Sequence, residues 1–267
     1  RSMVVQPKTG NIIAAGSSGN YFSVAQFLPS GVLDTSFGGA GIGYTYLPVH
    51  IAGGNLETCY AVGLQSTGNI ILAGVSENAF SELRFALACY TSAGILNRAF
   101  GTNGTAYISN SIAGGVDDEC FALAIQPDDK IVLAGYSDHV DGRSRFAVAR
   151  FTADGALDTT FGNGGTLYLP FIAGGTADIA YSVKLQKDGK IVVAGKSAFH
   201  FAFARLESHG TLDSTFGTNG TYFFTATNMI SARAMQLTDD AIIAGGSGNN
   251  MNYYSLCKLS NITTMQQ

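Results

Sequence analysis

The sequence predicts an all-β protein, and three features support this prediction. Short apolar runs alternate with turns rich in Gly, Asn, Asp and Ser, and Gly accounts for 34 of the 267 residues, which is typical of many short strands. No segment shows the apolar periodicity of a helix. One ten-residue motif also occurs four times, which indicates a tandem repeat.

The repeated motif defines units of roughly 60 residues. It reads LDTTFGNGGT from Leu157, LDTSFGGAGI from Leu33, LNRAFGTNGT from Leu96 and LDSTFGTNGT from Leu212. A second marker is an Ala-Gly pair that closes an apolar run, in NIIAAG, NIILAG, KIVLAG, KIVVAG and, with a further Gly, AIIAGG. The chain therefore divides into five units, approximately 1–60, 61–121, 122–181, 182–232 and 233–267, and the last lacks the ten-residue motif.

Each unit contains the pattern of four strands. In the third unit these are FALAIQ (121–126), KIVLAG (130–135), RFAVARF (145–151) and GTLYLP (165–170), with a tight turn at PDDK. Tandem four-stranded units of this length are typical of the blades of a β-propeller, which stack to bury their faces. We therefore predict one β-propeller domain over residues 1–267, built from about five four-stranded blades with the last incomplete.

The ten-residue motif is predicted to connect the third strand of each blade to the fourth. Leu157 and Phe161 are expected to pack the outer edge of the blade, and Asp158 is expected to bond nearby backbone. The glycines from 162 to 165 supply positions with positive φ. A motif that occurs once per blade indicates a structural role.

These repeats resemble a known family. The stretch ALAIQPDDKIVLAG, followed by RFAVARFTADGALDTTFGNGGT, is similar to the delta-60 repeat, a β-propeller-type repeat common in bacterial secreted and surface proteins. The similarity extends over nearly the whole chain, but the fifth copy, AIIAGGSGNNMNYYSLCKLSN, lacks the motif and a convincing fourth strand. The resemblance implies a scaffold and an extracellular or cell-surface location, and it supplies no catalytic residues to transfer.

Composition excludes some classes of protein. Charged residues make up 13% of the chain, the net charge is −4 and no basic cluster occurs, so a nucleic-acid partner is not expected. No apolar run is long enough to insert into a membrane as a spanning helix. The chain begins RSMVVQP, which indicates either a removed signal peptide or a fragment. The four cysteines form no CxxC pair, and they are either buried thiols or disulfides.

Acidic residues recur at one position between blades. Alignment of the blade-to-blade segments places Glu57, Asp118, Asp178 and Asn228 in equivalent positions, and Asp117 lies beside this set. Equivalent positions in a ring converge on one mouth of the channel, where carboxylates could hold Ca²⁺, which prefers six to eight oxygen ligands. The alternative is that each acid accepts backbone N–H groups within its own loop.

The loops between second and third strands vary most, and function on such folds usually lies on variable loops. Tyr21, Phe80, Phe199 and Tyr253 lie in or near these loops, and His139 lies in the longest one, SDHVDGRSR. We predict these five residues as contacts for a glycan or protein ligand. The alternatives are blade packing for the aromatic residues and a solvated loop for His139.

The sequence contains no GxSxG, HExxH or phosphate-binding loop motif. A non-enzymatic binding module of an exported protein is therefore the first functional prediction. The second is a structural protein that self-associates through an open blade edge. The third is a hydrolase that uses the acids between blades. No cofactor is expected apart from the calcium ion.

Overall fold

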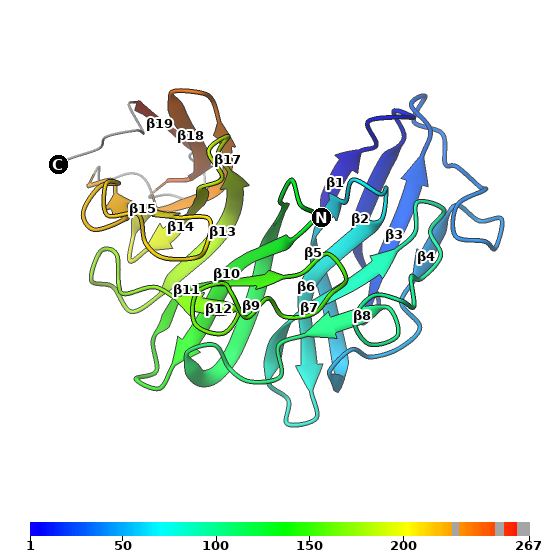
Figure 1. Ribbon diagram of the computed structural model, residues 1–267, viewed down its shortest axis with the longest axis horizontal. Helices are drawn as coiled ribbons and strands as arrows, with labels where there is room; N and C mark the ends of the chain where they lie inside the picture. The colour runs from blue at the N-terminus through cyan, green and yellow to red at the C-terminus, as the bar shows by residue number, and fades with distance from the viewer. Residues whose placement is uncertain (226–229, 249–253, 261–267) are drawn as a thin grey trace. The chain divides into compact units, whose positions relative to one another are not determined.

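The computed structural model describes residues 1–225, 230–248 and 254–260, which form β-strands and no helix (Figure 1). The first sheet has the order β1 (Ser2–Val5), β2 (Ile12–Ser18), β3 (Tyr21–Phe27), β4 (Tyr44–Tyr46). The second has the order β5 (Gly53–Leu64), β6 (Ile70–Asn78), β7 (Leu83–Tyr90), β8 (Thr105–Tyr107). The third has the order β12 (Thr166–Tyr168), β11 (Ser144–Phe151), β10 (Ile131–His139), β9 (Gly114–Ile125).

The last two sheets continue this pattern. The fourth has the order β13 (Asp178–Leu185), β14 (Ile191–Ser197), β15 (His200–Leu206), β16 (Thr221–Phe223). Among the described residues, the fifth contains three strands, β17 (Ser231–Leu237), β18 (Ala241–Ser247) and β19 (Tyr254–Ser260). The all-β, blade-wise prediction with an incomplete last blade is confirmed.

The chain forms two compact units. The first contains residues 1–111, 116–131 and 151–157, and the second contains 112–115, 132–150 and 158–267. The third sheet therefore contributes residues to both units. No helix in the described ranges is long and apolar enough to cross a membrane.

The first strand of two blades is longer than the sequence predicts. We expected a strand from Phe121, whereas β9 begins at Gly114, and β5 likewise begins at Gly53. The reason is a close approach that glycine permits. A Cβ on Gly54 would lie 2.5 Å from the Glu77 carbonyl oxygen, so only glycine lets β5 run on beside the end of β6.

The core lies between the middle strands. The apolar run in β10 from Ile131 to Ala134 is fully buried, as predicted for a strand covered on both faces. The first unit has a cluster that includes Phe22, Leu72 and Tyr90. The second unit has one that includes Phe203 and Met235.

The Ala-Gly marker coincides with a β-bulge in the first strand of the blade. Gly195 pairs with Ala180, where the register of β13 shifts before Ser182. A Cβ on Gly195 would lie 1.9 Å from the Ile179 carbonyl oxygen. Bulges bend a strand and bring its backbone toward the partner. The glycine therefore recurs because the backbone of the bulge fills the space that a side chain at the glycine position would need.

The ten-residue motif joins each blade to the next hairpin. Phe161 is fully buried, and a Cβ added to Gly210 would lie 2.9 Å from its ring. The Gly162 N–H donates to the His209 carbonyl oxygen at 2.9 Å. Phe37 approaches Gly94 and Phe100 approaches Gly155 in the same way. The predicted outer-edge packing of Phe161 is therefore a contact between neighbouring blades.

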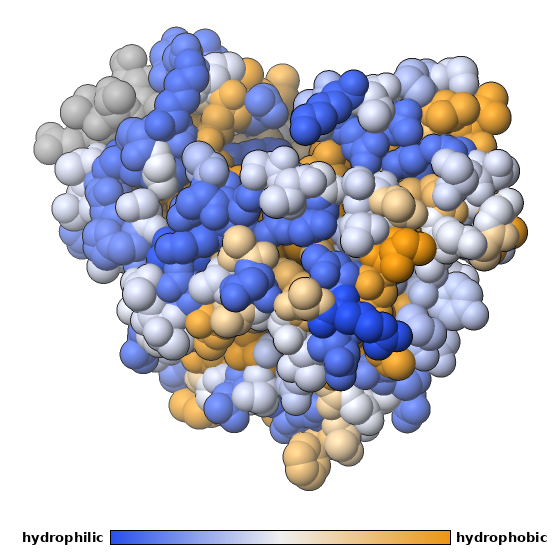
Figure 2. All heavy atoms as spheres, turned by 45° about the vertical axis from the view of Figure 1, so that its right-hand side comes forward, coloured by the Kyte–Doolittle hydropathy of each residue, from blue (hydrophilic) through white to orange (hydrophobic). Residues whose placement is uncertain are grey.

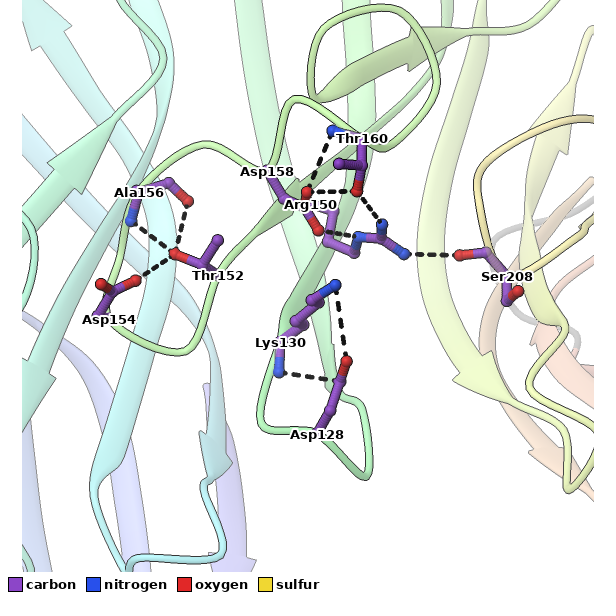
Figure 3. A network of polar contacts seen from close by, with 9 residues as sticks. All are labelled: Asp128, Lys130, Arg150, Thr152, Asp154, Ala156, Asp158, Thr160 and Ser208. Atoms are coloured by element: carbon purple, nitrogen blue, oxygen red, sulfur yellow. Dashed lines mark hydrogen bonds and ion pairs between the residues drawn. The ribbon is translucent and has the colours of Figure 1, made fainter.

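A polar contact links the same motif to the third strand. Asp158 accepts the Thr160 N–H at 3.1 Å, as predicted, and it also accepts Nε of Arg150 at 2.8 Å. Figure 3 shows Arg150 between this pair and the Ser208 carbonyl oxygen, to which its Nη1 donates at 2.6 Å. The Arg150 guanidinium also lies 4.7 Å from the ring centre of Phe161. The charge therefore helps to fix the buried ring.

The fourth blade has the most strongly charged form of this contact. Asp213 lies 2.7 Å from Nε of Arg205 and 2.7 Å from Nζ of Lys190. Burial would raise the pKa of Asp213, but hydrogen bonds from Lys190 and Thr215 and the charge of Arg205 outweigh it. They hold the pKa well below its usual range. The ion pairs therefore favour the ionised carboxylate in the folded state.

This contact predicts acid sensitivity. A folded-state pKa below the unfolded value stabilises the protein above about pH 4 and is lost as pH falls toward the folded value. Asp213→Asn should lower the free energy of unfolding at pH 7 by about 3 kcal/mol, because it leaves the buried Arg205 charge without its partner. Urea unfolding from pH 7 down to pH 2 measures both effects. The wild type should lose stability over this range faster than the variant, and parallel curves would contradict the role of Asp213.

The four cysteines are buried thiols, which settles the alternatives left open by the sequence. Burial raises the pKa of Cys59 to about 12 and those of Cys89 and Cys257 to about 11. These three side chains behave as small apolar groups.

Candidate functional site

The recurring acids lie buried within their own blades. Glu57, Asp118 and Asp178 are fully buried, and each blade places a serine at the end of its second strand. Ser76 pairs with Glu57 in the register of β5 and β6, and Ser197 pairs with Asp178 in that of β13 and β14. The acid and the serine therefore lie side by side, next to the loop that precedes the first strand.

Glu57 is held by several hydrogen bonds. Its Oε1 accepts the Ile51 N–H at 2.9 Å and the Ser76 hydroxyl at 2.9 Å. The Ser76 hydroxyl oxygen in turn accepts the Ala52 N–H at 2.9 Å. The other oxygen, Oε2, lies 2.6 Å from Nδ1 of His50. A buried carboxylate with fixed donors therefore holds one imidazole nitrogen.

His50 distinguishes this blade from its neighbours. The equivalent residue is Ser111 before Asp118, whose hydroxyl lies 3.3 Å from Oδ1 of that acid. The equivalent residue before Asp178 is Phe171, and Oδ1 of Asp178 has no hydrogen-bond partner among the described residues. Burial raises the pKa of Asp178, and hydrogen bonds from Ser197 and the Ile172 N–H only partly offset this effect.

Tyr21 completes the surroundings of His50. The two rings stack with centroids 5.0 Å apart and an interplanar angle of 25°, and the Tyr46 ring lies 6.1 Å from Tyr21. The His50 side chain is 29% exposed. Because Nδ1 donates to Glu57, the ring's second nitrogen, Nε2, carries the lone pair in the neutral tautomer. The pair has the form of a histidine base with an orienting acid.

The sequence prediction assigned Glu57 and Tyr21 to two different sites, and it did not include His50. The structure brings these three residues together. The signal was present in the sequence, because His50 precedes Glu57 by the same 7 residues that separate Ser111 from Asp118. The spacing between histidines, which can indicate a metal site, does not reveal the pair of His50 and Glu57, because the partner of His50 is an acid.

The predicted calcium ligands do not form a cluster in the described parts of the chain. Those parts contain no group of three or more His, Cys, Asp or Glu side chains that could hold a metal ion. Asp117 accepts the Leu83 N–H at 2.9 Å, and Asn228 lies outside the described residues. Calcium binding stays a prediction that the structure leaves untested.

The predicted loop contacts differ in their exposure. Phe80 and Phe199 are 83% and 75% exposed, whereas Tyr253 lies outside the described residues. His139 lies 3.1 Å from Asp141, and its ring centre lies 5.6 Å from that of Tyr168. Figure 2 shows one face of the molecule, on which apolar groups in orange lie in small patches among polar groups in blue.

Comparison with known proteins supports the repeat architecture. Residues 8–37, 126–161 and 186–216 match the family described as "Domain of unknown function (DUF5122) beta-propeller". Each of these segments contains the second and third strands of a blade and the first five residues of its ten-residue motif. No curated protein matches the sequence.

Several solved structures are similar to this chain at low sequence identity. A glucose dehydrogenase is 11% identical with a TM-score of 0.53, over 97% of this chain and 86% of that one. A protein of unknown function from Dyadobacter fermentans is 13% identical with a TM-score of 0.52, over 97% and 75%. A protein described as a putative gluconolactonase is 10% identical with a TM-score of 0.48, over 97% and 74%.

These comparisons correct the functional prediction. We expected a non-enzymatic binding module, and that expectation is contradicted because proteins with this fold, the glucose dehydrogenase among them, are enzymes. The absence of familiar catalytic motifs therefore does not exclude catalysis, because proteins that share one fold can catalyse different reactions. What the family match and the five sheets establish is the architecture: the chain is a β-propeller built from tandem repeats.

Proposed function

We propose that the chain is a propeller-fold hydrolase in which His50, oriented by Glu57, activates a water molecule. The observation that supports this proposal is the 2.6 Å contact between Nδ1 of His50 and Oε2 of Glu57. A histidine within reach of water is the commonest general base, and an acid on its other nitrogen fixes the tautomer.

The surroundings of the pair suit this chemistry. Glu57 is buried and its oxygens are held by Ile51, Ser76 and His50, so the acid stays in place while the imidazole gains and loses a proton. A preorganised partner of this kind needs no rearrangement during the reaction. His50 itself reaches solvent, where Nε2 takes the proton from water.

Carboxylic esters, including lactones, are the proposed substrates. When water adds to the carbonyl carbon, one proton must leave the water, and His50 accepts it. His50 then returns this proton to the leaving alkoxide. The Tyr21 ring stacks on the imidazole, and the Tyr46 ring lies tilted against Tyr21. Such faces accommodate the C–H groups of an apolar or cyclic alcohol portion.

The repeat offers a further reason for this assignment. Glu57, Asp118 and Asp178 are buried acids of three blades, but the residue seven positions before the acid changes from His50 to Ser111 and Phe171. If the only role of the acid were to hold its loop in place, a serine at this position would be sufficient, as Ser111 is beside Asp118. A histidine in one blade adds a titratable group that loop closure does not need.

The test is hydrolysis of 4-nitrophenyl acetate and δ-valerolactone by the purified chain. His50→Asn should lower kcat by about a hundredfold or more, because asparagine keeps a nitrogen donor for Glu57 but provides no base. The variant should unfold at the same temperature as the wild type.

His209→Gln is the matched control, because His209 is exposed and its Nε2 contacts only Thr211 among the described residues. This variant should hydrolyse both substrates like the wild type. Equal rates for the wild type and His50→Asn would reject the proposal.

The finer family assignment and the location also stand as proposals. We infer from the quoted repeats that the chain is of the delta-60 type and is exported. Amino-terminal sequencing of the native protein, recovered from the medium or the cell surface, tests the second point.

A further inference from the structure

Arg145 lies in an unusual environment at the start of β11. Its guanidinium carbon is 4.4 Å from the ring centre of Phe171 and 5.9 Å from that of Tyr168. Its Nη2 donates to Asp141 at 2.8 Å and lies 3.4 Å from Nδ1 of His139. The side chain is only 16% exposed. A partly buried cation thus lies near two aromatic rings, a stabilising arrangement.

Arg84 occupies the same position in the preceding blade and provides an internal comparison. Both arginines precede a Phe-Ala pair at the start of the third strand. Nη1 of Arg84 donates to the carbonyl oxygens of Leu83 and Val116, at 2.8 and 2.6 Å, and its Nη2 is paired with Glu82. Arg84 is therefore bound into the blade by backbone acceptors.

Arg145 lacks those acceptors. Within the described residues, its hydrogen bonds all come from Nη2, and none of them goes to a backbone carbonyl. The Thr176 carbonyl oxygen, which corresponds to that of Val116, instead accepts the Ser144 N–H at 3.3 Å. Both arginines have a buried Nε without a partner in these parts of the chain. Arg145 therefore keeps more of its donors available than Arg84 does.

A cavity of about 370 Å³ lies beside Arg145. Ile112, Leu167, Pro170 and the Tyr168 ring contribute apolar lining, and Asn163 and Thr166 contribute polar groups. Arg145 is the one charged residue among the described residues that line it. A mostly apolar cavity of this size with one charged group is the usual form of a small-molecule site.

We propose that this cavity binds a small monocarboxylate with an apolar body. The planar guanidinium matches the two oxygens of a carboxylate, and this charge-assisted pair is stronger beside apolar walls than in water. The apolar body lies against Tyr168 and Leu167. The site is separate from the proposed catalytic pair and does not depend on it.

Asp141 sets the strength of this binding. Its carboxylate already forms an ion pair with Arg145, so it competes with an incoming anion for the guanidinium. Asp141 is partly exposed, and its contact with Arg145 is therefore weaker than a buried pair. Removal of the Asp141 charge should leave Arg145 more attractive to a carboxylate.

Benzoate is the probe, and benzamide is the uncharged control of the same shape. Calorimetric or NMR titration of the full chain should show benzoate binding in the millimolar range and benzamide binding about tenfold or more weaker. Arg145→Gln should weaken benzoate binding by about tenfold. Asp141→Asn should strengthen it, and Tyr168→Ala should weaken it.

Arg98→Gln is the control variant, because Arg98 is exposed and lies in the other unit. It should bind benzoate like the wild type. Equal affinities for benzoate and benzamide, or unchanged benzoate affinity in both Arg145→Gln and Asp141→Asn, would overturn the proposal. If Arg145→Gln does not fold, the opposite effects of the Asp141 and Tyr168 variants decide the question.

Discussion

Replacing Gly246 with alanine should lower the free energy of unfolding by about 3 kcal/mol or more, because a methyl group has no space there. A Cβ at this position would lie 1.8 Å from the Ser231 carbonyl oxygen and 2.8 Å from the Arg233 nitrogen. Both contacts are with backbone, so relief requires β17 and β18 to separate. Loss of the pairing between β17 and β18 would expose the buried apolar side chains of these strands to water.

The neighbouring Gly245 provides the matched control in the same strand. A Cβ at Gly245 would meet Leu256 at 3.7 Å and the Ser255 carbonyl oxygen at 3.8 Å, which are ordinary contacts. Gly245→Ala should therefore change stability by less than about 1 kcal/mol, and toward greater stability, because alanine restricts the unfolded chain. Urea unfolding of the two variants measures the difference. Similar losses in both would show that the bulge does not determine the glycine.

This prediction extends to two other blades. Gly74 and Gly195 would each place a Cβ 1.9 Å from a carbonyl oxygen of the first strand, that of Thr58 or Ile179. Alanine at either position should be as harmful as at Gly246. The three sites share a cause, because a register shift in the first strand accompanies each of them.

The sequence predicted the blades well because strand patterns and turns are local. The run from Ile131 to Ala134 is apolar without interruption, and it is buried on both faces. The bulge opposite Gly195 was not predictable, because nothing in the local sequence shows which carbonyl will face the glycine. The contact between Phe161 and Gly210 joins two blades, and a single unit read alone cannot reveal it.

The candidate site was predicted in part. Glu57 and Tyr21 were identified by position, but His50 was found only when the structure placed its Nδ1 beside Glu57. Comparison of the segments between blades identifies a repeated acid. The same comparison places His50 at the position of Ser111 and Phe171, but only the structure shows that its Nδ1 lies beside Glu57. In a tandem repeat, the departures from the pattern therefore carry more functional information than the pattern itself.

Phe161→Ala should lower the free energy of unfolding by about 3–5 kcal/mol, the range for removing a buried aromatic ring. The ring is fully buried, the Arg150 guanidinium lies 4.7 Å from its centre, and Gly210 of the next hairpin leaves room for it. The cavity left by alanine cannot close easily, because the Gly162 N–H holds the same hairpin at the His209 carbonyl oxygen.

Phe199→Ala is the control for this variant, because it removes the same ring from a position that is 75% exposed. It should change stability by less than about 0.5 kcal/mol. Urea unfolding at neutral pH compares the two. A small loss for Phe161→Ala would mean that backbone bonds alone hold the hairpin to the preceding blade. A large loss would show that the motif recurs because each copy supplies the ring that fastens one blade to the next.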